Sequence, residues 1–112
     1  MPDFGPEGAI PFGLLTALAL CAGAVRAEIA PERAAELEHV VIQDCGSCHG
    51  LTMKGGLGSP LTPDVLRDAE PARLAGIILD GIPGTAMPPW RPVITEAQAR
   101  WIADYLLTGV TP

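Results

Sequence analysis

Apolar residues between positions 31 and 45 recur at spacings of three and four, which is the period of an amphipathic helix. They are Ala34, Leu37, Val41 and Cys45. Pro31 suits the first helical turn, and Glu32 complements the positive end of the helix dipole. The pattern therefore predicts a helix from about residue 31 to residue 45, with Gly46 as the first break after it.

Glycine and proline dominate residues 46–60 and leave no regular period, so this stretch is predicted to be mostly loop. Thr62-Pro63-Asp64 then opens a short helix that Leu66 would anchor. Glu70-Pro71 opens another helical segment, whose apolar face holds Leu74, Ile77 and Ile78. Gly81 is placed to end that segment by adopting a left-handed conformation.

The last predicted helix begins after Thr95, which forms a capping box with Gln98. It continues to about Leu107, with Gly109 beyond it, and its apolar face holds Ala99, Ile102 and Leu106, joined by Trp101 or Tyr105. Four prolines just before it exclude a helix or a central strand over residues 82–94. Since no segment alternates apolar and polar residues for long, the predicted fold class is all-α.

Residues 1–27 differ from the rest of the chain and are predicted to be a signal peptide. Ile10 to Val25 is an apolar run without charge, and Val25-Arg26-Ala27 resembles a cleavage site with small residues. The preceding residues carry Asp3 and Glu7 and no Lys or Arg, which is unusual for a signal peptide. A retained membrane anchor is the alternative. The mature domain is expected to comprise residues 28–112 and to be exported.

Residues 28–112 carry six Lys and Arg against eleven Asp and Glu, a formal charge of −5. This acidic balance argues against nucleic acid or anionic lipid as a partner, since both require a basic surface. A domain of this size buries only about 60 % of its unfolded surface, so its apolar core is marginal. Long ordered loops add a further entropic cost. A large rigid ligand would offset both.

The stretch Cys45-Gly46-Ser47-Cys48-His49 identifies that ligand. Two thiols at this spacing can reach the two vinyl groups of haem, and a histidine directly after the second thiol can bind the iron. A thioredoxin-like dithiol would need a strand before the motif, and none is predicted. Structural zinc needs four ligands, and only His39 could add to this set once Cys21 has left with the signal peptide. The motif therefore predicts one covalently attached haem c.

Met87 is the predicted ligand on the opposite face of the iron. Met53 lies only four residues after His49, too few for the chain to pass around the porphyrin, whereas Met87 lies 38 residues after it. Pro88 and Pro89 restrict the backbone beside Met87 and reduce the entropy lost when the loop is ordered. A thioether ligand favours ferrous iron and raises the reduction potential.

Three other residues near these ligands have alternative roles. His39 lies on the first predicted helix, too close to Cys45 to reach the distal face, and is interpreted as a solvated helix residue. Trp90 could pack on the haem and donate its indole N–H to a propionate, or it could anchor the loop. Arg91 could neutralise a propionate, or it could be a surface cation.

The motif CGSCH, a later methionine loop and a final WIADYLL helix together resemble the class I c-type cytochromes over residues 31–107. The resemblance implies that the N- and C-terminal helices cross, with Tyr105 packed at the crossing. It also implies that a backbone carbonyl, of Ser59 or Pro60, accepts a hydrogen bond from Nδ1 of His49, the histidine of the motif. With both axial positions filled, no site for a substrate remains, so an enzyme is not expected.

The longer runs CGSCHGLTMKGGLGSPL and ILDGIPGTAMPPW are similar to the small periplasmic NirC-type cytochromes that accompany cytochrome cd-type nitrite reductase. This resemblance implies a monomeric one-electron carrier to nitrite reductase in denitrification. One alternative is an accessory role in maturation of the special haem of that reductase. Another is a haem-based sensor or peroxidase with a displaceable Met87.

Overall fold

A computed structural model of the chain describes residues 28–111 together with Gly5 and Gly8. The predicted signal peptide lies outside the described residues apart from those two glycines. Residues 28–111 form helices and loops without a strand, which confirms the all-α prediction for this part of the chain. Within the same residues, no helix has the length and apolar character needed to cross a membrane.

The first helix is longer than predicted. α1 (Pro31–Val40) leads directly into a π-helical turn, η1 (Val41–Cys45), and then into α2 (Gly46–His49). The prediction that the helix ends near Cys45 is therefore wrong. Gly46 is buried and has helical backbone angles, φ −61° and ψ −26°, so it does not end the helix.

The shorter helices begin where the prolines predict. α3 (Pro63–Leu66) and α4 (Pro71–Asp80) each carry proline in the first turn, where the missing N–H has no helical partner to lose. Gly81 follows α4 with φ 66° and ψ −170°. Its φ is positive as predicted, but its ψ is extended, so the chain leaves the helix outward and does not curl back as in a left-handed turn.

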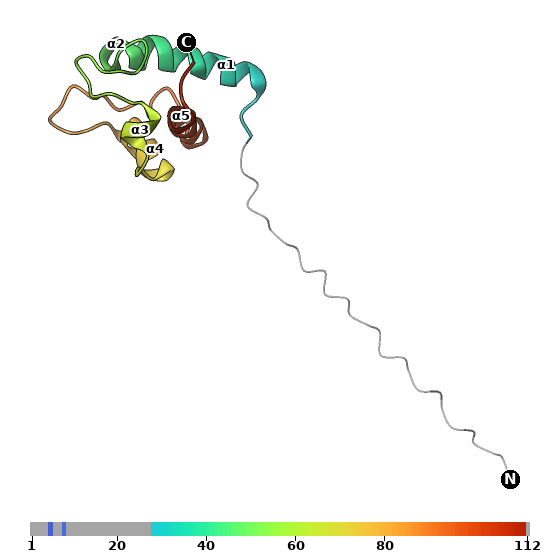
Figure 1. Ribbon diagram of the computed structural model, residues 1–112. Coiled ribbons are helices and arrows are strands. Elements are labelled where there is room, and N and C mark those ends of the chain that lie inside the picture. Colours follow the sequence, from blue (N-terminus) through green and yellow to red (C-terminus); the bar gives the residue numbers. More distant parts are fainter. Residues whose placement is uncertain (1–4, 6–7, 9–27, 112) are drawn as a thin grey trace.

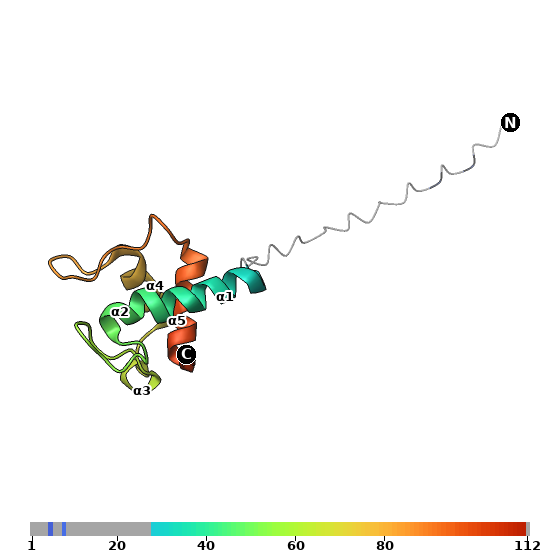
Figure 2. The same ribbon diagram turned by 90° about the horizontal axis from the view of Figure 1, so that it is seen from above.

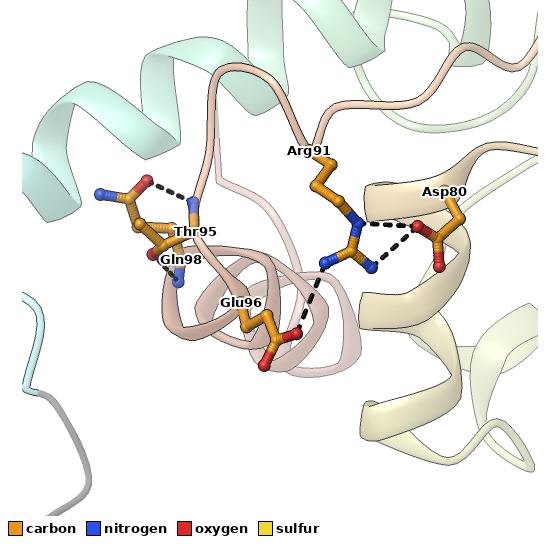
Figure 3. A network of polar contacts seen from close by, with 5 residues as sticks. All are labelled: Asp80, Arg91, Thr95, Glu96 and Gln98. Carbon is orange, nitrogen blue, oxygen red and sulfur yellow. Dashed lines mark hydrogen bonds and ion pairs between the residues drawn. The ribbon is translucent and has the colours of Figure 1, made fainter.

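α5 (Glu96–Thr108) begins with the predicted capping box. The backbone N–H of Gln98 donates to Oγ1 of Thr95 over 3.2 Å, and the backbone N–H of Thr95 donates to Oε1 of Gln98 over 3.1 Å (Figure 3). A cap of this kind stabilises a helix by about 1 kcal/mol because it satisfies donors that the first turn leaves free.

The core lies where α5 packs against α4 and against the crossing α1, which Figure 2 shows running over α5. Its buried apolar residues come from every long helix and include Leu37, Val41, Ile78, Leu79, Ala99, Ile102 and Leu106. Tyr105 is half-buried on α5, stacks on Trp101 with ring centroids 5.2 Å apart, and has a raised pKa owing to burial and to nearby Glu38 of α1. Tyr105 thus lies at the helix crossing.

Two long loops determine where a ligand can bind. Residues 50–62 follow α2, and residues 81–95 connect α4 to α5. Both views show these loops at the same end of the domain as α2 (Figures 1 and 2). The fold thus brings the motif on α2 and the methionine loop together although they are far apart in the sequence.

Candidate functional site

A cleft of about 560 Å³ opens between α2 and the two long loops. Its lining residues include Cys45, Cys48, His49, Leu57, Gly58, Ser59, Leu61, Ile78, Ile82, Thr85, Ala86, Met87, Pro88, Trp90, Ile102 and Leu106. The volume lies within the usual range for cofactor pockets, and most of the lining is apolar. The four residues predicted as haem attachment sites and iron ligands therefore surround one cavity.

His49 is held in a defined orientation by the loop that follows it. Its Nδ1 lies 2.7 Å from the carbonyl oxygen of Ser59. Because a carbonyl can only accept, Nδ1 is the donor, and in the neutral imidazole Nε2 then presents a lone pair. The structure thus assigns the acceptor to Ser59, which the sequence could not separate from Pro60. This arrangement is typical of an imidazole that binds a metal through Nε2.

Backbone hydrogen bonds fasten this loop to the end of α2. The N–H of Gly55 donates to the carbonyl of His49, and the N–H of Gly58 donates to the carbonyl of Cys48, each over 2.8 Å. These bonds satisfy carbonyl groups that the helix end leaves free. Gly58 also lies against the imidazole: a Cβ there would be 2.7 Å from Nδ1 and from Cε1 of His49.

The two cysteines of the motif are free thiols three residues apart along the helical path, so they project on the same side of it. Cys45 is half-buried, and burial, followed by the charge of Asp44, raises the pKa of its thiol to about 11. Cys48 is exposed. Neither thiol forms a disulfide, so both sulfur atoms are available for bonds to a cofactor.

Met87 is half-buried in the loop between α4 and α5, and polar contacts hold its backbone from both sides. The N–H of Ile82 donates to the carbonyl of Met87 over 3.2 Å. The N–H of Met87 donates to Oγ1 of Thr85 over 3.3 Å, and the hydroxyl of Thr85 donates to the carbonyl of Ile82 over 2.7 Å. Thr85 therefore joins the two ends of this turn.

The part of the loop that follows Met87 is attached to the end of α4. Trp90 N–H donates to the carbonyl of Ile78 over 3.1 Å, and the Trp90 side chain packs on the core while lining the cleft. Arg91 binds Oδ1 of Asp80 through Nε at 2.9 Å and Nη2 at 2.8 Å, and it reaches Glu96 at 3.4 Å (Figure 3). The guanidinium is thus occupied by two carboxylates and does not line the cleft. These carboxylates raise its pKa.

Two other predicted residues lie outside the cleft lining. His39 is exposed on α1, as expected for a solvated helix histidine. Met53 is 2 % exposed, belongs to the core, and has a positive φ of 59°.

Sequence reasoning did not single out Gly58 or the hydroxyl of Thr85. Their only signal in the sequence is their place, between the motif and Pro60 and two residues before Met87.

The residues present fit a haem. A porphyrin supplies the in-plane ligands of its iron, so the protein needs one ligand for each face, and His49 and Met87 reach the cleft from separate segments. A cation bound only by protein would need a denser set of ligands. Among residues 28–111, no group of three or more His, Cys, Asp or Glu side chains is arranged to hold a metal ion.

Comparisons with known proteins agree with this chemistry. Residues 32–106 match the family described as cytochrome c oxidase, cbb3-type, subunit III. Cytochrome c55X of Paracoccus denitrificans is 62 % identical over 76 residues, which cover 68 % of this chain and 74 % of the relative. The solved c-type cytochrome NirC is 44 % identical with a TM-score of 0.70, over 71 % of this chain and 94 % of that chain.

A larger protein contains a similar segment. Dihydro-heme d1 dehydrogenase of Pseudomonas aeruginosa is 32 % identical over 89 residues, which cover 80 % of this chain but only 18 % of the dehydrogenase. A solved structure of such a dehydrogenase, NirN, has a TM-score of 0.58 and 34 % identity over 62 % of this chain and 15 % of that chain. The similarity is thus confined to a small part of the dehydrogenase.

Proposed function

Because this chain belongs to the c-type cytochromes, in the group that includes cytochrome c55X and NirC, and therefore carries covalent haem c, we propose that it is a one-electron carrier to dissimilatory nitrite reductase. The proposal also places the mature protein in the periplasm, since c-type attachment takes place outside the cytoplasm. Residues 1–27 would then be a cleaved signal peptide. The mass of the exported holoprotein tests this point.

Four residues carry the proposed site. Cys45 and Cys48 would hold the haem through thioether bonds, and His49 and Met87 would bind the iron. The observation that supports this most is the hydrogen bond of 2.7 Å between Nδ1 of His49 and the carbonyl of Ser59. It leaves Nε2 unprotonated within a cleft that Met87 also lines.

The haem supplies a one-electron couple between ferrous and ferric iron. His49 and Met87 would fill both axial positions, so no open position remains for a substrate, which favours a carrier over an enzyme. The neutral thioether of Met87 and the apolar cleft lining favour the ferrous state over the ferric state, because the ferric site carries one more positive charge.

Nitrite reductase is proposed as the partner on the basis of the NirC-type loop sequences and the acidic surface. Residues 28–112 carry a formal charge of −5, which steers the protein toward positively charged docking sites. Stopped-flow mixing of the reduced protein with oxidised cd-type nitrite reductase measures this directly. We expect electron transfer whose rate falls as the salt concentration rises, because salt screens the attraction.

Substitution of the two methionines tests the ligand assignment. Met87→Leu should abolish the weak absorption band near ~700 nm that marks methionine–iron bonding in the oxidised protein, and it should lower the reduction potential. Met53→Leu is the matched control: its side chain is buried in the core and does not line the cleft, so the band and the potential should remain. If Met87→Leu keeps both, Met87 is not the ligand.

A role in maturation of haem d1 is the second candidate. The observation that favours it is the similar segment within dihydro-heme d1 dehydrogenase, since a segment of this type accompanies haem d1 chemistry there. A strain lacking this protein separates the two functions. Loss of a carrier leaves nitrite reductase with its full complement of haem d1 but with slow turnover. Loss of a maturation factor leaves the reductase without haem d1.

A further inference from the structure

The loop that presents Met87 is stabilised by two hydrogen bonds of one exposed hydroxyl. Thr85 lines the cleft beside Met87 and lies outside every helix. Its hydroxyl accepts from the N–H of Met87 over 3.3 Å and donates to the carbonyl of Ile82 over 2.7 Å. The backbone N–H of Thr85 also donates to this carbonyl, over 3.1 Å. Thr85 thus bonds to both ends of the turn from Ile82 to Met87.

We propose that the Thr85 hydroxyl is a positioning group for the sixth iron ligand, because it fixes the backbone of Met87 and thereby the place of its sulfur. This inference rests on the proposed ligation of iron by Met87. Thr85 itself does not contact the iron in this proposal. It acts through the two hydrogen bonds of its hydroxyl, which we call the Thr85 bridge.

A methionine sulfur needs such support because its side chain has three rotatable bonds and adapts readily to irregular gaps. Pro88 and Pro89 restrict the backbone that follows Met87, but neither has an N–H that could hold the turn. On the other side, the N–H of Met87 donates to Oγ1 of Thr85. The Thr85 bridge therefore holds the N–H of the ligand residue, while the bond from the N–H of Ile82 holds its carbonyl.

A hydroxyl is required at this position because the bridge uses both of its functions. One O–H donates to the carbonyl of Ile82 while an oxygen lone pair accepts from Met87. Valine has the same shape as threonine but can do neither. Serine can do both, although it lacks the methyl group that restricts the side-chain torsion of threonine.

Competition for the iron provides the test. Imidazole added to the oxidised holoprotein displaces the methionine, and the loss of the band near ~700 nm measures its apparent dissociation constant. A net hydrogen bond contributes about 1 kcal/mol, so Thr85→Val should tighten imidazole binding by about fivefold. Thr85→Ser should remain within about twofold of the unsubstituted protein.

Thr108→Val is the matched control. The hydroxyl of Thr108 donates to the carbonyl of Tyr105 over 3.0 Å, three residues earlier, as Thr85 does to Ile82, but Thr108 lies at the end of α5 and does not line the cleft. We expect no change in imidazole affinity. Because Thr85 is exposed and outside the helices, the far-ultraviolet circular dichroism of both Thr85 variants should be unchanged.

Two results would overturn the proposal. One is unaltered imidazole affinity in Thr85→Val, and the other is equal affinity in Thr85→Val and Thr85→Ser, because serine keeps the hydroxyl that valine lacks and retaining it would then make no difference. Failure of the underlying ligation is distinguishable, because the band would then survive Met87→Leu. If Met87→Leu abolishes the band and Thr85→Val leaves the imidazole affinity unchanged, only the role of Thr85 is excluded.

Discussion

The two sides of the cleft are built by different physical means. The proximal segment, residues 45–60, carries five glycines and one proline, whereas the distal segment, residues 81–93, carries two glycines and four prolines. In the proximal segment, backbone amides bond to the carbonyls of Cys48 and His49, and Gly58 lies against the imidazole. Such close packing of the chain on itself leaves no room for larger residues.

The distal segment extends away from the helices and is restricted by proline, with a few hydrogen bonds at its base. Thr85 and Ile82 hold Met87, and Arg91 joins the returning chain to Asp80 of α4. None of residues 81–93 is buried, whereas Gly46 and Met53 of the proximal segment are. Packing therefore restrains the histidine side more than the methionine side, so the methionine loop should open first when the protein is destabilised.

Gly58→Ala should disturb the packing of the proximal segment and cause the largest loss in the free energy of unfolding. The new Cβ would lie 2.7 Å from Nδ1 and Cε1 of His49, so the ring must move and its bond to Ser59 must weaken. Overpacking of this kind costs about 3 kcal/mol, measured by denaturant unfolding of the holoprotein. Gly76→Ala in α4, where nothing lies within 4 Å, is the control and should stabilise by up to about 1 kcal/mol. Equal stability of both variants would contradict the comparison.

Gly81→Ala should disturb the distal side with a smaller loss of stability and a larger change at the iron. A Cβ there would lie 2.7 Å from the carbonyl oxygen of Met87, and φ of 66° adds strain. We expect the loop to shift, with a loss of about 2 kcal/mol and a weaker band near ~700 nm. Gly84→Ala has a φ of 78° but open space, so it should show the strain without the change in the band. A full band in Gly81→Ala would argue against this coupling.

Arg91→Gln should have the smallest effect, because its ion pairs are about half exposed to water. The melting temperature should fall by about 2 °C or less at low salt, and the difference should vanish near about 0.5 M salt as the charges are screened. Arg67→Gln is the control, since its contact with Asp68 is 3.8 Å long and highly exposed. A large loss that persists at high salt would mean that the guanidinium supports the loop by packing.

The helix starts could be predicted from the sequence because they depend on local chemistry. Pro71 and the pair Thr95 and Gln98 act within one turn, and the structure confirms the helices that they open. The continuation of the first helix through Cys45 could not be predicted. Gly46 has a low intrinsic preference for helix, but it is buried in the fold, and this tertiary setting overrides that preference.

The candidate site divides in the same way. The spacing of Cys45, Cys48 and His49 matches the two vinyl groups and the iron of haem, so the motif could be recognised without a structure. The choice of Ser59 as acceptor depends on the direction of one carbonyl group, which only the folded loop determines. The partners of Arg91 lie 11 residues before it and five residues after it, and only the fold brings them together.

The π-helical turn Val41–Cys45 has a consequence for orientation. A π turn holds one more residue than an α turn, so it rotates the side chains that follow it about the helix axis. Before it, Leu37 is buried in the protein interior, whereas Cys45 at its end and Cys48 after it line the cleft. Deleting one residue within this turn would rotate the cysteines relative to the body of the domain. This turn therefore sets the direction in which the two thiols would attach the haem edge relative to the body of the domain.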